Sequence, residues 1–118
     1  MKYMFLIYLD EKSLSQAERT QCYEESAEYA RELHASGRRV LAAPLHPTQT
    51  ATSLRTREGK RLVTDGPFAE TREQLAGLFL VDAKNLDEAI EIAEKIPAGR
   101  WGTVEIRPVL EVPGLPEN

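Results

Sequence analysis

The order of strand-like and helix-like segments in these 118 residues predicts an α+β fold. The segments follow each other as β-α-β-hairpin-β-α-β, which is the ferredoxin-like, or split βαβ, plan with an antiparallel sheet and an inserted β-hairpin. The hydrophobic fraction of 42% is ordinary for a globular domain, and the length suits one core rather than two. We therefore assign residues 1–112 to a single domain and residues 113–118 to a C-terminal tail.

The first two elements have the strongest pattern. Residues 2–9 are a continuous apolar run, typical of a strand that is covered on at least one face. Ser15 and Glu18 form a capping box, in which each side chain accepts a hydrogen bond from an amide at the start of a helix. An apolar stripe at helical spacing follows. Gly37 is expected to end the helix, because glycine readily adopts the left-handed conformation found after the last helical residue. The pattern predicts a helix over residues 15–36.

The middle of the chain predicts a short strand and a hairpin. Residues 40–43 (VLAA) form the strand, which Pro44 ends. Residues 50–57 alternate in character, residues 58–60 (EGK) make a short loop, and residues 61–64 return.

The C-terminal half adds a strand, a helix and a strand. Residues 75–81 read as a buried strand, Asn85 opens a helix over residues 86–95 that Pro97 ends, and residues 103–110 form the last strand. Two helices can cover only one face of an antiparallel sheet, so both are expected on the same face. The other face needs a cover of its own, and a homodimer joined sheet to sheet is the simplest arrangement.

Composition and charge exclude several classes of function. The net charge of −4 and the scattered basic residues argue against a nucleic-acid-binding surface. The opening apolar run stops at Asp10, too short to span a membrane, and no signal peptide opens the chain, so we expect a cytoplasmic protein with no membrane partner. The single Cys22 excludes an internal disulfide and is expected as a small buried hydrophobe. His34 and His46 give no metal signature, and no phosphate-binding loop or nucleophile motif indicates a cofactor.

Residues 65–73 (DGPFAETRE) are the most informative segment for function. Asp65 precedes a Gly-Pro pair that makes a tight turn and sets the directions of the following side chains. Its carboxylate has two interpretations: an acid or base at a strand end, or an Asx-turn in which the side chain bonds a backbone amide two residues on. Phe68 is expected to pin the loop to the core, and we include it among the ligand-binding candidates.

Other charged residues complete the candidate site. Glu70 and Glu73 flank Arg72, which could hold a carboxylate ligand with two hydrogen bonds, and an exposed ion-pair run is the alternative. Glu73 is closer to the following strand and is the better candidate to face a pocket. His46 is a candidate general base together with Asp65, or else a surface residue at a strand end. Arg107 is either an anion anchor or a member of an ion pair.

This signature resembles that of one subgroup of the YCII-related family, which carries Lys in place of Arg72. Other segments match the same subgroup over nearly the whole chain: Lys2-Tyr3-Met4, Gln74-Leu75 with Gly77, Ile96-Pro97-Ala98 and residues 104–108. The resemblance implies a dimeric α+β barrel with a site in a cleft under the sheet or at its edge. It also implies kinship in fold with small lactone-processing enzymes and, because genes of this subgroup often lie beside sigma-factor genes, a sigma-factor system as a partner.

One departure from the family affects the expected chemistry. Other branches carry a His in the first helix and an Asp near the end of the second, proposed as a catalytic pair. The corresponding positions here are Ser26 and Ile96, so the pair is not carried over.

Two functions agree with these observations. The first is a small-molecule-binding protein, acting as a ligand-sensing or regulatory module for a small polar or anionic molecule. The alternative is an enzyme of lyase, isomerase or hydrolase type that acts on a small anionic or lactone-like metabolite by acid/base chemistry. The missing His-Asp pair favours the first function, and the carboxylate-rich signature favours the second.

Overall fold

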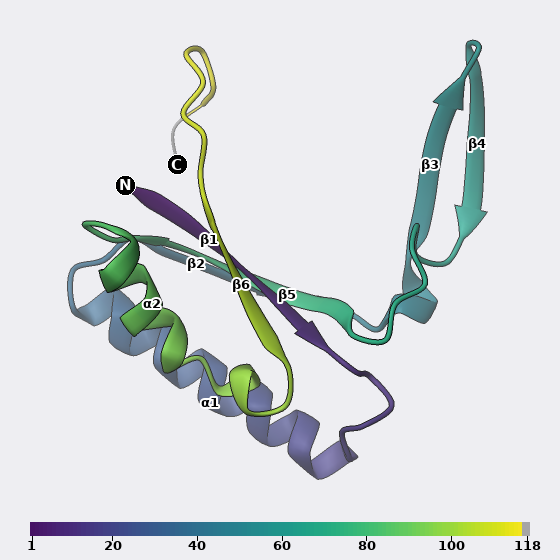
Figure 1. Ribbon diagram of the computed structural model, residues 1–118. Coiled ribbons are helices and arrows are strands. Elements are labelled where there is room, and N and C mark those ends of the chain that lie inside the picture. Colours follow the sequence, from purple (N-terminus) through teal and green to yellow (C-terminus); the bar gives the residue numbers. More distant parts are fainter. Residues whose placement is uncertain (117–118) are drawn as a thin grey trace.

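The computed structural model describes residues 1–116, which contain the predicted order of elements (Figure 1). The strands and helices are β1 (Lys2–Leu9), α1 (Gln16–Ala35), β2 (Val40–Pro44), β3 (Thr52–Arg57), β4 (Lys60–Asp65), β5 (Gln74–Asp82), α2 (Leu86–Glu94) and β6 (Thr103–Pro108). Two short 3-10 helices, η1 (Thr48–Thr50) and η2 (Pro97–Arg100), lie between them.

Four strands form the main sheet in the order β2-β5-β1-β6, and every neighbouring pair is antiparallel. This order places the first strand in the interior of the sheet, as the ferredoxin-like plan requires. The predicted α+β fold with an antiparallel sheet is therefore confirmed.

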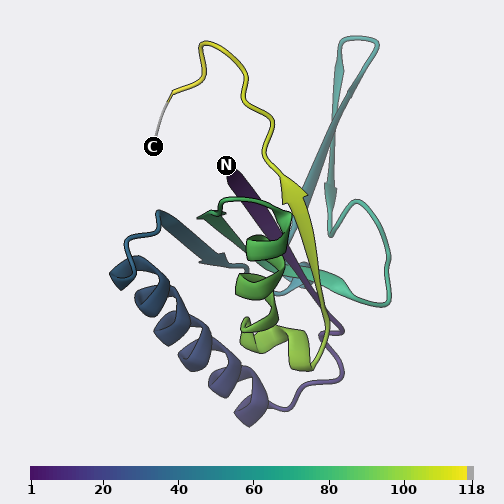
Figure 2. The same ribbon diagram turned by 60° about the vertical axis from the view of Figure 1, so that its left-hand side comes forward.

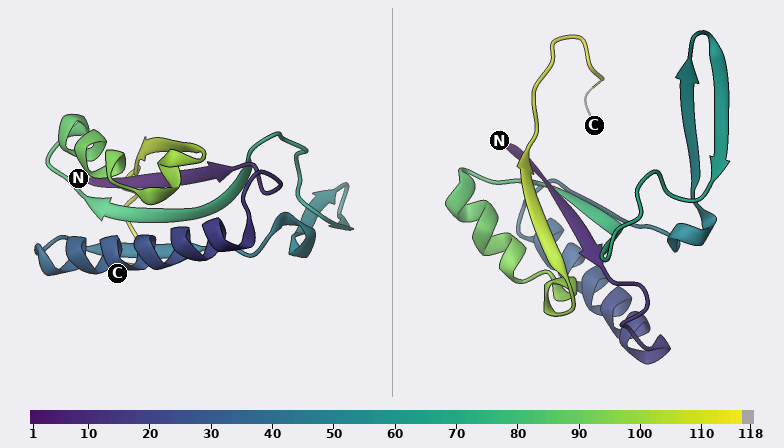
Figure 3. Two further views of the ribbon diagram at one scale, coloured as in Figure 1. Left: turned by 90° about the horizontal axis from the view of Figure 1, so that it is seen from below. Right: turned by 45° about the vertical axis from the view of Figure 1, so that its right-hand side comes forward.

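Both helices cover the same face of this sheet, with α1 beneath β2 and α2 beneath β6 (Figures 1 and 3). Alternate residues of β1 point toward them, so Tyr3, Phe5 and Ile7 are buried. The helices meet where the hydroxyl of Tyr29 on α1 donates to the backbone carbonyl of Ile92 on α2 at 2.7 Å. The core thus lies in one layer between the sheet and the helix pair.

The predicted helix signals act as expected. The Ser15 hydroxyl accepts from the Glu18 amide, and the Glu18 carboxylate accepts from the Ser15 amide, which completes the capping box. These hydrogen bonds hold the pKa of the Glu18 carboxyl below its ordinary value. Gly37 follows the helix with φ of 90°, the left-handed conformation that glycine adopts without strain. None of the helices in the described part of the chain is both long and apolar enough to cross a membrane.

The hairpin of β3 and β4 forms a separate two-stranded sheet that stands away from the main body (Figures 1 and 2). Its turn is Glu58-Gly59, and both residues have positive φ, as a two-residue hairpin turn requires. The prediction that strand character begins at residue 50 is wrong by two residues. The amide and hydroxyl of Thr50 both donate to the Pro47 carbonyl, at 2.9 and 2.7 Å, which holds η1 in place of a strand.

The second face of the main sheet is covered by neither helix. Apolar side chains line its centre, because the residues of β1 and β5 that alternate with the buried ones point that way. Met4 and Leu6 lie there opposite Leu80 and Leu78, and Leu41 on the edge strand is 52% exposed. This face is therefore an apolar surface that neither helix covers.

Candidate functional site

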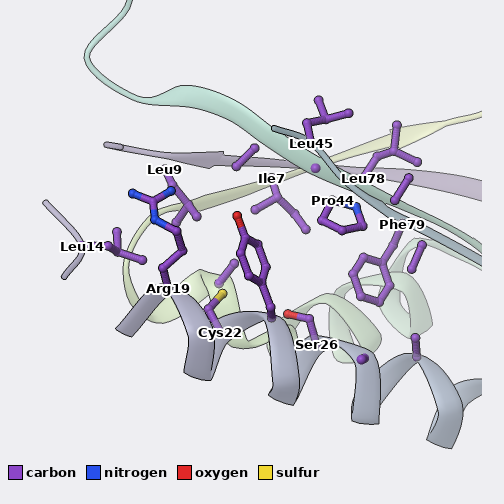
Figure 4. Close-up of a pocket in the computed structure, with 18 of the residues that line it drawn as sticks. Ile7, Leu9, Leu14, Arg19, Cys22, Ser26, Pro44, Leu45, Leu78 and Phe79 are labelled. Carbon is purple, nitrogen blue, oxygen red and sulfur yellow. The ribbon is translucent and has the colours of Figure 1, made fainter. Parts of the chain in front are cut away.

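A cavity of about 410 Å³ lies between α1 and the edge of the sheet formed by β2 and β5 (Figure 4). Ile7 and Phe79 line it from the strands, and Arg19, Cys22 and Ser26 line it from α1. Most of the lining is apolar, with a few polar groups on one helix face. This combination is typical of small-molecule sites.

Small residues on both sides explain why the helix and the sheet leave this space. Several residues of α1 along the cavity are small, and so are several strand residues that line it: Ser26, Ala27 and Ala30 on α1, and Ala42, Ala43, Ala76 and Gly77 on β2 and β5. A longer side chain on either side would fill the gap.

Gly77 also lets β2 come close to β5. A Cβ at this position would lie 3.0 Å from the carbonyl oxygen of Ala43 and 3.2 Å from the Cα of Pro44. A bulge in the β1–β5 pairing leaves Ala76 without a partner on β1, and its carbonyl accepts from the Leu45 amide at 2.8 Å. The strand ends beside the cavity are therefore held by backbone contacts.

Arg19 is the main polar group of the cavity. Its Nη2 donates to the backbone carbonyl of Glu11 at 2.9 Å. The Glu11 carboxylate is directed elsewhere, since its two oxygens accept from the amide and the hydroxyl of Thr48 at 2.8 and 2.9 Å. Among residues 1–116, no carboxylate forms an ion pair with Arg19.

Cys22 and Ser26 lie one helical turn apart on the same face of α1. Burial raises the pKa of the Cys22 thiol, and the nearby Ser26 hydroxyl offsets this only in part. The thiol is therefore protonated near neutral pH and only 5% exposed, which makes it a poor nucleophile. The prediction that Cys22 is a small buried hydrophobe is confirmed.

Asp65 lies at the end of β4, outside the cavity and exposed. Its side chain makes no hydrogen bond to any described residue, and Pro67, two residues on, has no amide to give an Asx-turn. The turn is held instead by the Gly66 amide, which donates to the Ala51 carbonyl at 2.7 Å, and by the Ser53 hydroxyl on the Gly66 carbonyl. The Asx-turn interpretation is wrong.

Phe68 does not pin the signature loop to the core. Its ring is 73% exposed, and it packs beneath the Arg55 guanidinium, which lies 4.5 Å from the ring centroid. The expected core contact is wrong because the loop follows the detached hairpin away from the main sheet.

The remaining predicted site residues are spread over different surfaces. Glu73 is half-buried and accepts from the Thr103 hydroxyl at 2.9 Å, while Arg72 beside it is exposed. Arg107 forms an ion pair with Glu105 on its own strand at 3.3 Å. This contact agrees with the interpretation of Arg107 as a member of an ion pair. None of these residues lines the cavity.

His46 is the predicted residue whose neighbours in the chain, Leu45 and Pro47, line the cavity. His46 itself is exposed and does not line the cavity, so it lies next to the rim. Among residues 1–116, no group of three or more His, Cys, Asp or Glu side chains is placed to hold a metal ion.

Sequence reasoning missed Arg19 and its neighbours on α1. The sequence contained one indication of this helix face: Ser26 stands at the position where other branches of the family that the chain resembles carry His. The structure places Ser26 on the wall of the cavity.

Comparison with known proteins gives one family. The model of the YCII-related domain matches residues 1–113 of this chain. The chain is also similar to an uncharacterized protein of Rhizobium meliloti (strain 1021), with 38% identity over 118 aligned positions that cover 92% of each chain.

Proposed function

The chain belongs to the YCII-related domain family, and we propose that it is a small-molecule-binding protein whose ligand occupies the cavity beneath α1. The observation that carries this proposal is the lining, which combines apolar side chains with the guanidinium of Arg19, a group that forms no ion pair with residues 1–116. Such a site can take up an apolar body and orient it by one polar end.

Binding without catalysis fits the chemistry of the lining. The Glu11 carboxylate accepts hydrogen bonds from the amide and the hydroxyl of Thr48, and the Cys22 thiol is protonated. Neither group is therefore free to act as a base or a nucleophile. The proposed role is that of a ligand-sensing or regulatory module. A sigma-factor system as its partner is a proposal that rests on the family resemblance.

The second candidate is an enzyme that acts by acid/base chemistry on a small anionic or lactone-like molecule. The observation that favours it is His46 at the rim, where an imidazole could reach the exposed end of a bound molecule. Asp65 and the carboxylates of the signature loop would have to approach the rim for this reaction.

We also propose that the uncovered sheet face pairs with a second copy of the chain. A row of apolar residues on β1, β2 and β5 supports this pairing, since monomers rarely expose an apolar surface of that kind. The cavity opens on the helix side of the same sheet, so dimerisation would leave it accessible.

Titration calorimetry with 1-octanol tests the binding proposal, because the alcohol matches the apolar lining and carries no charge. Ser26→Phe places a ring in the cavity and should weaken binding about tenfold or more. Ala17→Phe, at an exposed position of α1 outside the cavity, is the matched control and should bind like the parent. Equal octanol affinity in Ser26→Phe and Ala17→Phe would reject the cavity as the site, and so would a parent that binds neither octanol nor its carboxylate counterpart, octanoate.

A further inference from the structure

We propose, building on the cavity function above, that the ligand is an apolar monocarboxylate whose carboxylate is held by Arg19. The cavity gives three observations on the chemistry of its ligand: the free donors of Arg19, the sum of the charges that line it, and the apolar residues that line it beyond Arg19.

The guanidinium of Arg19 has unused donors. Of its five N–H groups, one is engaged with the Glu11 carbonyl, and no other hydrogen bond of this side chain to the described residues is present. The Arg19 nitrogens that make no such hydrogen bond are accessible to solvent, and the side chain lines the cavity. A guanidinium with a fixed fork and free donors binds a carboxylate with two parallel hydrogen bonds.

The contact with Glu11 also fixes the direction of this side chain. Figure 4 shows Arg19 rising from the first turns of α1 toward Leu9, at one end of the cavity. Since the Nη2 donor is tied to the backbone, the guanidinium is positioned before a ligand arrives, which lowers the entropy cost of binding.

The charge balance favours a single negative charge on the ligand. The charged side chains that line the cavity are Arg19, Arg31 and Glu11, which sum to +1 from two cations and one anion. A monoanion neutralises this charge. A dianion such as a phosphate monoester would leave an excess negative charge close to Glu11, which is unfavourable in a partly enclosed site.

The rest of the cavity matches an apolar body. Beyond Arg19, the α1 face continues along Ser26 and Ala30, and Phe79 lies opposite on β5. Between Arg19 and Arg31, the polar side-chain groups of α1 that line the cavity are the hydroxyls of Tyr23 and Ser26 and the neutral thiol of Cys22. A chain of several methylene groups would bury apolar surface along this floor.

Calorimetric titration with octanoate, 1-octanol and octyl phosphate at neutral pH tests the inference. The parent should bind octanoate at least about tenfold more tightly than octanol, and octyl phosphate more weakly than octanoate. Arg19→Gln should lower octanoate affinity about tenfold and leave octanol affinity unchanged. The control Arg57→Gln removes an equal charge from the detached hairpin and should change neither affinity.

The outcomes separate this inference from the function on which it rests. Equal binding of octanoate and octanol to the parent, or full octanoate affinity in Arg19→Gln, would overturn the carboxylate assignment while the cavity stays a binding site. Tighter binding of octyl phosphate would overturn the single charge. Failure of all three probes to bind the parent would remove both proposals. Unchanged octanol affinity shows that Arg19→Gln is folded. If Arg19→Gln does not fold, Arg19→Lys replaces it. Arg19→Lys should bind octanoate more weakly than the parent does, but still more tightly than it binds octanol.

Discussion

The Tyr29 hydroxyl on α1 donates to the Ile92 carbonyl on α2 at 2.7 Å, a buried contact between the two helices of the core layer. It joins residues 63 positions apart in the chain and fixes how the cavity-bearing helix lies beside its neighbour. The geometry of the site therefore depends on a contact outside it.

Tyr29→Phe should lower the free energy of unfolding by about 1 kcal/mol, because it removes one buried hydrogen bond and keeps the ring. Urea denaturation of both proteins measures the difference. Tyr23→Phe on the same helix, where the residue is 45% exposed and its hydroxyl makes no hydrogen bond to the described residues, is the control and should be near neutral. Equal stability of Tyr29→Phe and the parent would show that the helix contact contributes nothing.

The same residue predicts a pH dependence. Burial raises the pKa of the Tyr29 phenol, and Arg38 nearby offsets this in part. A raised folded-state pKa contributes stability that is fully present below the unfolded-state pKa of about 10 and is lost as the pH rises further. The stability advantage of the parent over Tyr29→Phe should therefore shrink above about pH 10 in urea denaturation series. A constant difference across that range would contradict the buried, neutral phenol.

Gly77→Ala should destabilise the protein by about 1–3 kcal/mol, because the added Cβ would press on the backbone of β2 at Ala43 and Pro44. Gly99→Ala is the control, since its Cβ would meet only a Val104 methyl at 3.9 Å. Thermal unfolding of the two variants compares them directly. A Gly77→Ala variant as stable as Gly99→Ala would mean that β2 can move away from β5 at no cost.

Asp65→Asn and Asp65→Ala should both have a free energy of unfolding within about 0.5 kcal/mol of the parent's, since the carboxylate is exposed and makes no hydrogen bond to the described residues. The binding proposal further predicts unchanged octanoate affinity in both. Calorimetric titration checks this. Loss of affinity with retained stability would instead favour the enzyme candidate, with Asp65 in the site.

The proposed dimer predicts a stable pair at micromolar concentration that buries more than about 1,000 Å² in total. Leu41→Glu places a charge on the uncovered sheet face and should shift sedimentation toward the monomer. Leu110→Glu, at a site that is 80% exposed beyond β6, should leave the pair intact. Sedimentation of the parent as a monomer would contradict the pairing.

The fold was predictable from sequence because its signals are local. The capping box of Ser15 and Glu18, the glycine Gly37 that ends the first helix and the continuous apolar run of residues 2–9 are each signals between residues close in the chain. Element ends were less predictable where side chains bond nearby carbonyls, as Thr50 does in η1.

The cavity was not predictable in the same way. It is lined by small residues from separate elements, such as Ala30 on α1 and Gly77 on β5, and a single alanine or glycine carries no such signal in sequence. The signature loop drew attention because its carboxylates are close in sequence, yet the loop follows an exposed hairpin and Asp65 lies apart from the cavity.

A two-dimensional NMR titration of the parent with octanoate tests the central claim most directly, since it reports binding residue by residue. The amide shifts should change along α1 between Arg19 and Ala30 and at the facing ends of β2 and β5, and stay unchanged in residues 65–73. Shifts confined to residues 65–73 or to the uncovered sheet face would contradict a ligand site beneath α1.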